Sequence, residues 1–451
     1  MKFIGLSFGL IFGLIFLLNT SFAQNGTDRF KSEIDLGGGT VITTFLDFRL
    51  AENEFKMTSP KNADVRIMGG KARLGRVMGK APKKGTIVTI KGTKQADSLI
   101  GQTAIPMFGK LGFKGIVKAG TLSGELVNNA GEAVGTVKGT SSKEERMNYS
   151  ELYPKVINTI KENIYSKEVL QTGEWKKFEK KLEKLFHKSH DDIELFFGFS
   201  ILSQKLPFTH LNFLITQDTS DNMGTEVPAK SVFFEEKDPE TAYLQIKNFS
   251  TSADELTEIL PKIVGNPAYK NLIIDLRNNG GGGIDAAFAF AKYIVAEDLE
   301  VGYFPTNKLA YSGYQPELFS KLPEMQPKTT DEFGNELKTT PGVKLVFKKP
   351  SNPVFTGKIY ILTNGNTAST CEPIVYALKS DKRATIIGER TRGAMLSASP
   401  FVVSGKYLLM LPVGDFYTHD GVRLDKAGVA PDIEVKSEEA LTKALELIQA
   451  K

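Results

Sequence analysis

Residues 24–144 alternate apolar and polar side chains in short segments. Alternation with a period of two is typical of β-strands that bury one face. Turns rich in glycine, or in asparagine and glycine, separate these segments. The clearest alternating segments are residues 41–48, 85–90 and 134–137, and the clearest turns are residues 37–39, 69–70 and 128–131. The pattern predicts a separate N-terminal all-β domain, a small sandwich or a barrel, whose role the sequence does not reveal.

From residue 145 to residue 215 the period changes to that of a helix, with apolar residues at steps of three or four. These residues are Leu152, Val156, Ile160 and Ile164, followed by Trp175, Phe178, Leu182 and Leu185. We therefore expect a helical segment here. His187 and His190 lie near its second stretch, but a metal site would need further ligands held nearby, and a polar helix end is the more usual interpretation.

Residues 216–437 alternate short apolar β runs with helical stretches, which predicts βαβ units around a largely parallel sheet. The runs are residues 243–246, 253–263, 272–276, 284–295, 359–363, 369–378 and 385–388. The stretch 301–353 interrupts the pattern with many Pro, Lys and Tyr residues. An insertion of that length is usually functional, for instance as a substrate lid. A C-terminal helix is expected over residues 438–451.

The N-terminus carries the pattern of a secretory signal. Lys2 precedes an apolar run over residues 3–18, and Ser21 and Ala23 provide the small side chains of a cleavage site. The run is short for a spanning helix of roughly 20 residues. We predict that residues 1–23 are cleaved, so that the protein is secreted or periplasmic and has no stable membrane insertion; an uncleaved anchor is the alternative.

The amino-acid composition excludes several kinds of functional site. In 451 residues there are 57 Lys and Arg against 52 Asp and Glu, a net charge of +5, with one Cys and four His. A single cysteine excludes an intrachain disulfide and a zinc site of several thiolates. The charge does not indicate a nucleic-acid partner. A basic stretch over residues 71–94 is more typical of a solvated face than of a polyanion site. No cofactor and no metal are expected.

Two turns carry candidate chemistry, and the first follows the apolar run over residues 272–276. Four glycines, Gly280 to Gly283, stand between this run and the next helical stretch. Glycines allow close backbone approach, and their amides can point at a developing negative charge. Because the phosphate-binding glycine motifs are missing, an oxyanion hole is favoured, with a tight structural turn as the alternative.

The second turn ends the run over residues 359–363 and opens a helix at Ser369. A serine there lies in the positive field of the helix, with its own amide free to bind an oxyanion, as in nucleophile elbows. Ser369 and Glu372 also match a capping box, in which the serine would only satisfy the Glu372 amide. Cys371 has no obvious activating base, so we expect it to be buried packing.

Taken together, the two turns and two later motifs resemble the C-terminal processing (tail-specific) serine peptidases. The motifs occur in the order Asp275-Leu276-Arg277-x-Asn279-x-Gly281-Gly282, Thr367-Ala368-Ser369-x-x-Glu372, Gly388-Glu389-x-Thr391-x-Gly393 and Gly428-Val429-x-Pro431-Asp432. The resemblance covers residues 241–437 well and residues 146–215 loosely. It implies a sheet domain of the crotonase/ClpP type, a polypeptide substrate and an acyl-enzyme mechanism.

The resemblance also implies roles for individual residues. Ser369 would be the nucleophile, and its amide with that of Gly281 or Gly282 would form the oxyanion hole. The lysine that acts as base in this family would stand at Ala394, so it is absent. The tricorn-like branch uses a histidine before the sheet domain instead. That implies His210 as the base and Asp425 as the carboxylate that orients it, a Ser-His-Asp arrangement in place of Ser-Lys. His419 is the substitute for His210.

Only about 30 residues separate His210 from Tyr243, which is too few for the PDZ domain that many relatives insert there. The prediction is therefore a secreted serine peptidase, without a PDZ domain, that hydrolyses extended or unfolded polypeptides. One alternative is a catalytically inactive relative that binds peptides or hydrophobic ligands. Another is an esterase with the same machinery. The sequence leaves the oligomeric state open.

Overall fold

The structure is a computed structural model, which describes residues 28–36, 41–60, 88–105, 109–216 and 230–450. The predicted signal sequence and most of the basic stretch lie outside these residues. The chain divides into two compact units, one of Met1–Asn148 with Lys188–Leu195 and one of Tyr149–His187 with Phe196–Lys451. No helix in the described part of the chain is long and apolar enough to cross a membrane.

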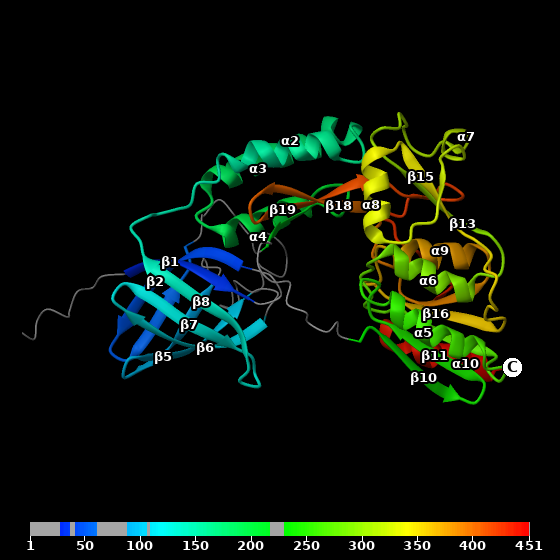
Figure 1. The fold of residues 1–451 in the computed structure, drawn as a ribbon, viewed down its shortest axis with the longest axis horizontal. Coiled ribbons are helices and arrows are strands. Elements are labelled where there is room, and N and C mark those ends of the chain that lie inside the picture. Colours follow the sequence, from blue (N-terminus) through cyan, green and yellow to red (C-terminus); the bar gives the residue numbers. More distant parts are fainter. Residues whose placement is uncertain (1–27, 37–40, 61–87, 106–108, 217–229, 451) are drawn as a thin grey trace, which may run out of the picture. The chain divides into compact units, whose positions relative to one another are not determined.

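The first unit contains a closed antiparallel barrel of eight strands, β1 to β8 (Figure 1). The strands are β1 (Asp28–Asp35), β2 (Val41–Ala51), β3 (Glu54–Thr58), β4 (Thr89–Gln95), β5 (Ser98–Ile105), β6 (Gly109–Lys118), β7 (Thr121–Val127) and β8 (Ala133–Ser141). Phe55 and Phe113 fill the interior where strands carry glycine. A Cβ at Gly124 would lie 2.5 Å from the Phe113 ring. The predicted N-terminal all-β region is confirmed.

The segment Lys188–Leu195 belongs to the barrel unit because its carboxylates bind strand β2. Asp191 Oδ2 accepts a hydrogen bond from Thr44 Oγ1 at 2.5 Å, and Asp192 Oδ2 accepts one from the Thr43 amide at 2.9 Å. Burial raises the pKa of Asp191 to about 7, although its hydrogen bonds oppose the rise. His190, considered above as a metal ligand, instead has Nδ1 3.2 Å from Glu194 Oε2.

The second unit is built on a six-stranded sheet in the order β10-β11-β12-β16-β17-β21. Its strands are β10 (Val232–Asp238), β11 (Thr241–Ile246), β12 (Asn271–Asp275), β16 (Lys358–Thr363), β17 (Ala384–Gly388) and β21 (Ile433–Glu434). All neighbours after β11 are parallel, whereas β10 is an antiparallel edge. The predicted α/β domain is confirmed.

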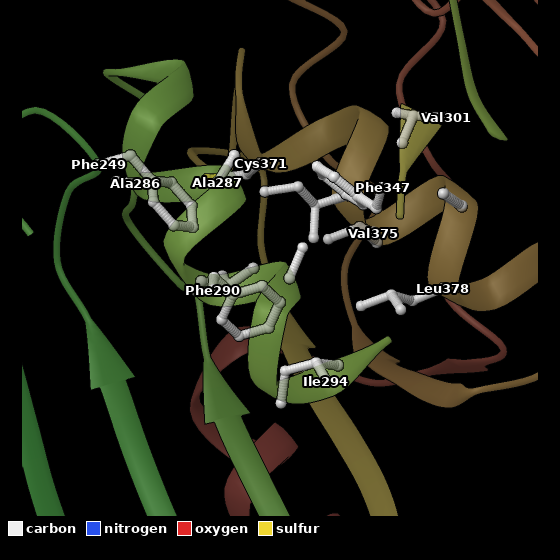
Figure 2. Close-up of a cluster of buried hydrophobic side chains, with 14 of the residues drawn as sticks. Phe249, Ala286, Ala287, Phe290, Ile294, Val301, Phe347, Cys371, Val375 and Leu378 are labelled. Carbon is white, nitrogen blue, oxygen red and sulfur yellow. The ribbon is translucent and has the colours of Figure 1, made fainter. Parts of the chain in front are cut away.

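Helices cover both faces of this sheet, as the alternation of buried side chains requires. Leu272 and Ile274 point into the main core, with α5 (Ala253–Val264), α6 (Ile284–Ile294) and α9 (Cys371–Ser380). Figure 2 shows side chains of α6 and α9 meeting in this core. The intervening Ile273 points to the opposite face, where α10 (Ala440–Gln449) packs.

The stretch 301–353 is more regular than its sequence indicates. It contributes most of β13 (Leu299–Pro305) and all of β15 (Gly342–Phe347), which pair antiparallel. These strands belong to a four-stranded sheet, β14-β15-β13-β20. Between β13 and β15 the chain forms α7 (Pro316–Phe319), β14 (Glu324–Met325) and α8 (Thr330–Thr339), whereas β20 (Tyr417–Thr418) comes from later in the chain. Because β13 also pairs with β20, far along the chain, local periodicity could not reveal this sheet.

A third sheet of the second unit has three strands in the order β18-β19-β9. The strands are β18 (Ser397–Ser404), β19 (Tyr407–Gly414) and β9 (Asn212–Ile215). The helical stretches predicted before the sheet domain form α2 (Leu152–Asn163), α3 (Gly173–Lys188) and α4 (Asp192–Ser203). The ring of Phe199 in α4 stacks on Phe213 of β9 at 5.4 Å between centroids.

Candidate functional site

Ser369 lies in the tight connection between β16 and α9, where the backbone is strained. Its φ is +55°, a left-handed conformation that a residue with a side chain rarely adopts. Such strain is typical of functional turns, because the surrounding structure must hold it in place. The Ser369 side chain is half-buried, so the turn presents the hydroxyl at the margin of the core.

The capping-box alternative does not account for this hydroxyl. The Glu372 amide donates to the backbone carbonyl of Ser369 at 2.8 Å, and not to Oγ. Ser369 Oγ has no hydrogen-bond partner among the residues that the structure describes. Only the other half of the capping box forms, because the Ser369 amide donates to Glu372 Oε2 at 3.1 Å. The hydroxyl is thus left available for chemistry.

Glu372 fastens the turn to the segment that follows β17. Its buried carboxylate accepts from Thr391 Oγ1 at 2.6 Å, from the Gly393 amide at 2.7 Å and from the Ala394 amide at 2.8 Å. Burial raises the pKa of Glu372, and these hydrogen bonds oppose the rise. Ala394, the position at which the resemblance implied a lysine, and Ser369 therefore both donate their amides to the Glu372 carboxylate.

Gly281 lies against the serine, and two of the three predicted oxyanion donors are already engaged in hydrogen bonds. A Cβ on Gly281 would lie 2.6 Å from the Ser369 Cβ, so only glycine fits beside the serine. The Gly281 amide donates to Asn279 Oδ1 at 2.9 Å, and the Ser369 amide, expected to be free, donates to Glu372. The Gly282 amide has no partner within the described ranges. Gly282 is thus the available donor of the three.

His210 lies on the loop between α4 and β9, with φ at +64°. Its Nδ1 is 2.7 Å from Thr209 Oγ1, which donates its hydrogen to Asp425 Oδ1 at 2.5 Å. A hydroxyl has one hydrogen, so Nδ1 must be the donor in its contact with Thr209. The neutral ring then carries its lone pair on Nε2, the form that a general base needs.

The pKa of His210 is lowered, mainly by burial. The charge of Asp425 opposes this shift, and that of Arg392 adds to it. The imidazole is therefore neutral at pH 7. Asp425 is linked to His210 through the hydroxyl of Thr209, a residue that sequence reasoning did not select. The signal for it was a hydroxyl directly before the candidate base.

Asp425 and Glu372 bring the histidine and the serine to the same segment. The Met395 amide donates to Asp425 Oδ1 at 3.2 Å, and the preceding amide, of Ala394, donates to Glu372. Consecutive residues are only ~3.8 Å apart, so the two carboxylates are neighbours. No hydrogen bond joins His210 to Ser369 among the described residues, and catalytic contacts are often long before substrate binds.

His419, the substitute base, lies at the other end of α9. Its Nε2 is 3.4 Å from the hydroxyl of Ser380, the last residue of that helix. Ser380 follows Ser369 by 11 positions, which corresponds to roughly 16 Å of helix. His419 is thus placed away from the serine. Cys371 is fully buried in the main core, where burial raises the pKa of its thiol, so the thiol is packing as expected.

A small cavity of about 230 Å³, whose lining includes the Arg423 that contacts Asp425, was not anticipated from the sequence. Tyr165, Tyr311 and Asp415 line it together with Arg423. The guanidinium of Arg423 is 2.9 Å from Asp415 Oδ2 and 3.6 Å from Asp425 Oδ2. The cavity thus shares Arg423 with the Asp425 carboxylate. The Tyr311 hydroxyl is buried and has no hydrogen-bond partner within the described part of the chain.

Residues 240–435 match the model of peptidase family S41. The resemblance to the C-terminal processing peptidases is confirmed. The chain is 26% identical over 211 residues to the carboxy-terminal processing protease CtpA of Bacillus subtilis (strain 168), which covers 47% of this chain and 38% of that protein. It is 23% identical over 198 residues to the chloroplastic C-terminal processing peptidase of Tetradesmus obliquus, which covers 44% and 35%. The chain thus matches only about a third of the length of these relatives.

Solved structures of peptidases are also similar. The photosystem II D1 C-terminal processing protease gives a TM-score of 0.41 at 15% identity, covering 65% of this chain and 94% of that one. The tricorn protease gives 0.43 at 13% identity, covering 90% and 46%. The matched family model is that of a peptidase family, and both curated relatives are named as processing proteases or peptidases.

Proposed function

We propose that this protein is a serine peptidase that cleaves extended or unfolded polypeptides through an acyl-enzyme at Ser369. The observation that carries the proposal is the combination of an unpartnered serine hydroxyl with a histidine whose free nitrogen is defined by Thr209 and Asp425. An unaided serine is a weak nucleophile and needs a neighbouring base. The Ser-His-Asp arrangement would supply that base in place of the missing lysine.

In this mechanism His210 Nε2 removes the proton from Ser369 Oγ as Oγ attacks the carbonyl carbon of the substrate. The amide of Gly282 donates to the resulting oxyanion. His210 then passes the proton to the departing amine, and water hydrolyses the ester in a second cycle of the same steps. Asp425 stabilises the imidazolium through Thr209. Loosening of the 3.1 Å bond to Glu372 would free the Ser369 amide as a second donor.

The proposal includes a location and a finer fold assignment. Cleavage of residues 1–23 would deliver the enzyme to the periplasm or the exterior, where unfolded polypeptides are its substrates. The six-stranded sheet and its helices would be a crotonase/ClpP-type core. An esterase would share all of this machinery and differ only in the acyl donor.

A fluorophosphonate tests the proposal directly, because it reacts only with an activated serine. We expect a covalent adduct on Ser369, found by mass spectrometry of tryptic peptides, and none in Ser369→Ala. His210→Gln should slow labelling by about a hundredfold. The labelling rate should rise with pH as His210 loses its proton. The midpoint of this rise should lie below the ordinary histidine pKa of about 6.5, because the pKa of His210 is lowered. Wild-type protein that stays unlabelled while folded would contradict the assignment.

A further inference from the structure

The three-stranded sheet β18-β19-β9 has one covered face and one open face. On the covered face Leu409 and Leu411 of β19 and Phe213 of β9 are buried. Helices supply the cover: Phe199 of α4 stacks on Phe213, and Lys338 of α8 lies 5.3 Å from the centre of the Phe401 ring. Since side chains alternate along a strand, the residues between these point to the opposite face.

That opposite face is mostly apolar, with Asn212 opposite Met410 as its polar member, and the exposure of Pro400 and Val402 shows that none of the described helices covers them. Across the sheet Pro400 stands opposite Met410, and Val402 stands opposite Leu408, which in turn stands opposite Leu214. Val402 is 72% exposed and Pro400 is exposed, while the other three are half-buried. Ala398 precedes Pro400 by two residues on β18 and so points to the same side. We call these six residues the outer face: Leu214, Ala398, Pro400, Val402, Leu408 and Met410. A solvated face of an antiparallel sheet is normally polar, so a contiguous apolar one indicates a binding surface.

Strand β18 also forms an edge of this sheet, so one row of its backbone groups has no ladder partner. Pro400 is consistent with that edge, because proline in a sheet places its nitrogen on the side away from the ladder. The amides two residues away, of Ala398 and Val402, then point to the same open side. An extended peptide placed along β18 could accept hydrogen bonds from both.

The outer face is continuous with the candidate site, because two of its strands begin there. Strand β18 starts two residues after Met395, whose amide binds Asp425. Strand β9 starts two residues after His210. A chain lying along β18 would therefore have one end beside the turn that carries Ser369.

We propose that the outer face and the open edge of β18 bind an extended apolar segment of the polypeptide substrate and direct it to Ser369. This inference rests on the proposed function and names the surface and substrate chemistry that serve it. Apolar side chains of the segment would pack on Val402 and Met410, while its backbone pairs with β18 as a fourth strand. An apolar surface beside unpaired backbone donors fits a peptide better than a lipid, because acyl chains have no groups that pair with a strand edge.

Binding is measured in the Ser369→Ala background, so that no turnover occurs. The probe is a fluorescein-labelled, 15-residue peptide of alternating valine and threonine, and the readout is fluorescence anisotropy. Val402→Glu should weaken binding by about tenfold or more, because it places a charge in the apolar contact. Ile116→Glu is the matched control, since Ile116 is an exposed β-branched residue on the barrel. It should leave the affinity unchanged.

A second variant separates the backbone from the side chain. Val402→Pro removes the outward amide, and Val402→Thr keeps both the amide and the branched shape. We expect the proline variant to bind the peptide several-fold more weakly than the threonine variant, with circular dichroism and thermal unfolding confirming that both are folded. In the Ser369-containing protein, all these variants should react with a fluorophosphonate at the wild-type rate, since that small probe needs no strand contact.

Equal peptide affinity in Val402→Glu and Ile116→Glu would overturn the inference, and labelling of Ser369 would still support the peptidase. Conversely, loss of peptide binding in Val402→Glu with no labelling of Ser369 would support the binding surface and contradict the assignment as a serine peptidase. Sedimentation velocity and flotation with phosphatidylcholine and phosphatidylglycerol vesicles complete the test. A dimer, or vesicle binding, that Val402→Glu abolishes would show that a second copy or a membrane is the occupant instead.

Discussion

At the scale of single residues, the site depends on the acceptor to which each amide or hydroxyl group donates its hydrogen bond. Ser369 Oγ stays without a partner because the Glu372 carboxylate accepts a hydrogen bond from the Ser369 amide and not from the Ser369 hydroxyl. His210 presents Nε2 because Thr209 gives its only hydrogen to Asp425. Both outcomes follow from counting donors and acceptors, and neither requires an unusual distance.

The hydroxyl of Thr209 should be needed for the position and tautomer of His210. Thr209→Val keeps the shape but removes the hydroxyl, and should lower kcat/KM for peptide hydrolysis by about a hundredfold with little change in KM. Thr209→Ser keeps the hydroxyl and should retain most of the activity. The pH profile separates this role from a merely structural one, because only loss of the link to Asp425 should move the acid limb. Equal activity of the valine and serine variants would refute the role of Thr209.

At the scale of elements, a carboxylate at the start of α9 organises the site. Glu372 binds the turn before the helix and three groups of the segment 391–394. A helix N-terminus favours a negative charge, which helps to retain a carboxylate in this buried position. The same carboxylate positions the residues that lead into β18.

Glu372→Gln should destabilise the protein by about 1–3 kcal/mol, because the amide group of glutamine turns a donor towards backbone N–H groups. The measurement is the free energy of unfolding in urea, followed by circular dichroism. Glu438→Gln changes an exposed carboxylate near the C-terminus and should have no effect. Fluorophosphonate labelling of the folded Glu372→Gln protein should also slow, since the turn loses its anchor. A variant as stable as the wild type would contradict the structural role.

At the scale of the whole molecule, the chain forms two compact units with different interiors. The peptidase-like unit has an apolar core around its parallel sheet, whereas the barrel unit buries the carboxylate of Asp191 against Thr44. Because Asp191 belongs to the barrel unit, its titration should affect the stability of that unit.

The barrel unit should become less stable as pH rises. The pKa of Asp191 is about 7 in the folded protein, above its unfolded value of about 3.9. Its contribution is therefore complete below the lower value and is lost as pH rises through about 7. Asp191→Asn should flatten the fall in urea midpoint between pH 5 and pH 8, and Asp97→Asn, at an exposed position of the barrel, should not. Parallel pH dependences of wild type and Asp191→Asn would exclude the titration of this group.

The sequence by itself determined the N-terminal β region, the α/β alternation and the turn that carries Ser369. These features depend on local periodicity and on glycine, which a short stretch of chain specifies by its own sterics and burial. Only the tertiary structure decided that Thr209 stands between His210 and Asp425, because Thr209 and Asp425 are 216 positions apart in the sequence. It also decided that the Ser369 and Gly281 amides are engaged, and that β13 pairs with β20. A hydrogen bond goes to whichever partner the fold brings within about 3 Å, and sequence spacing does not contain that choice.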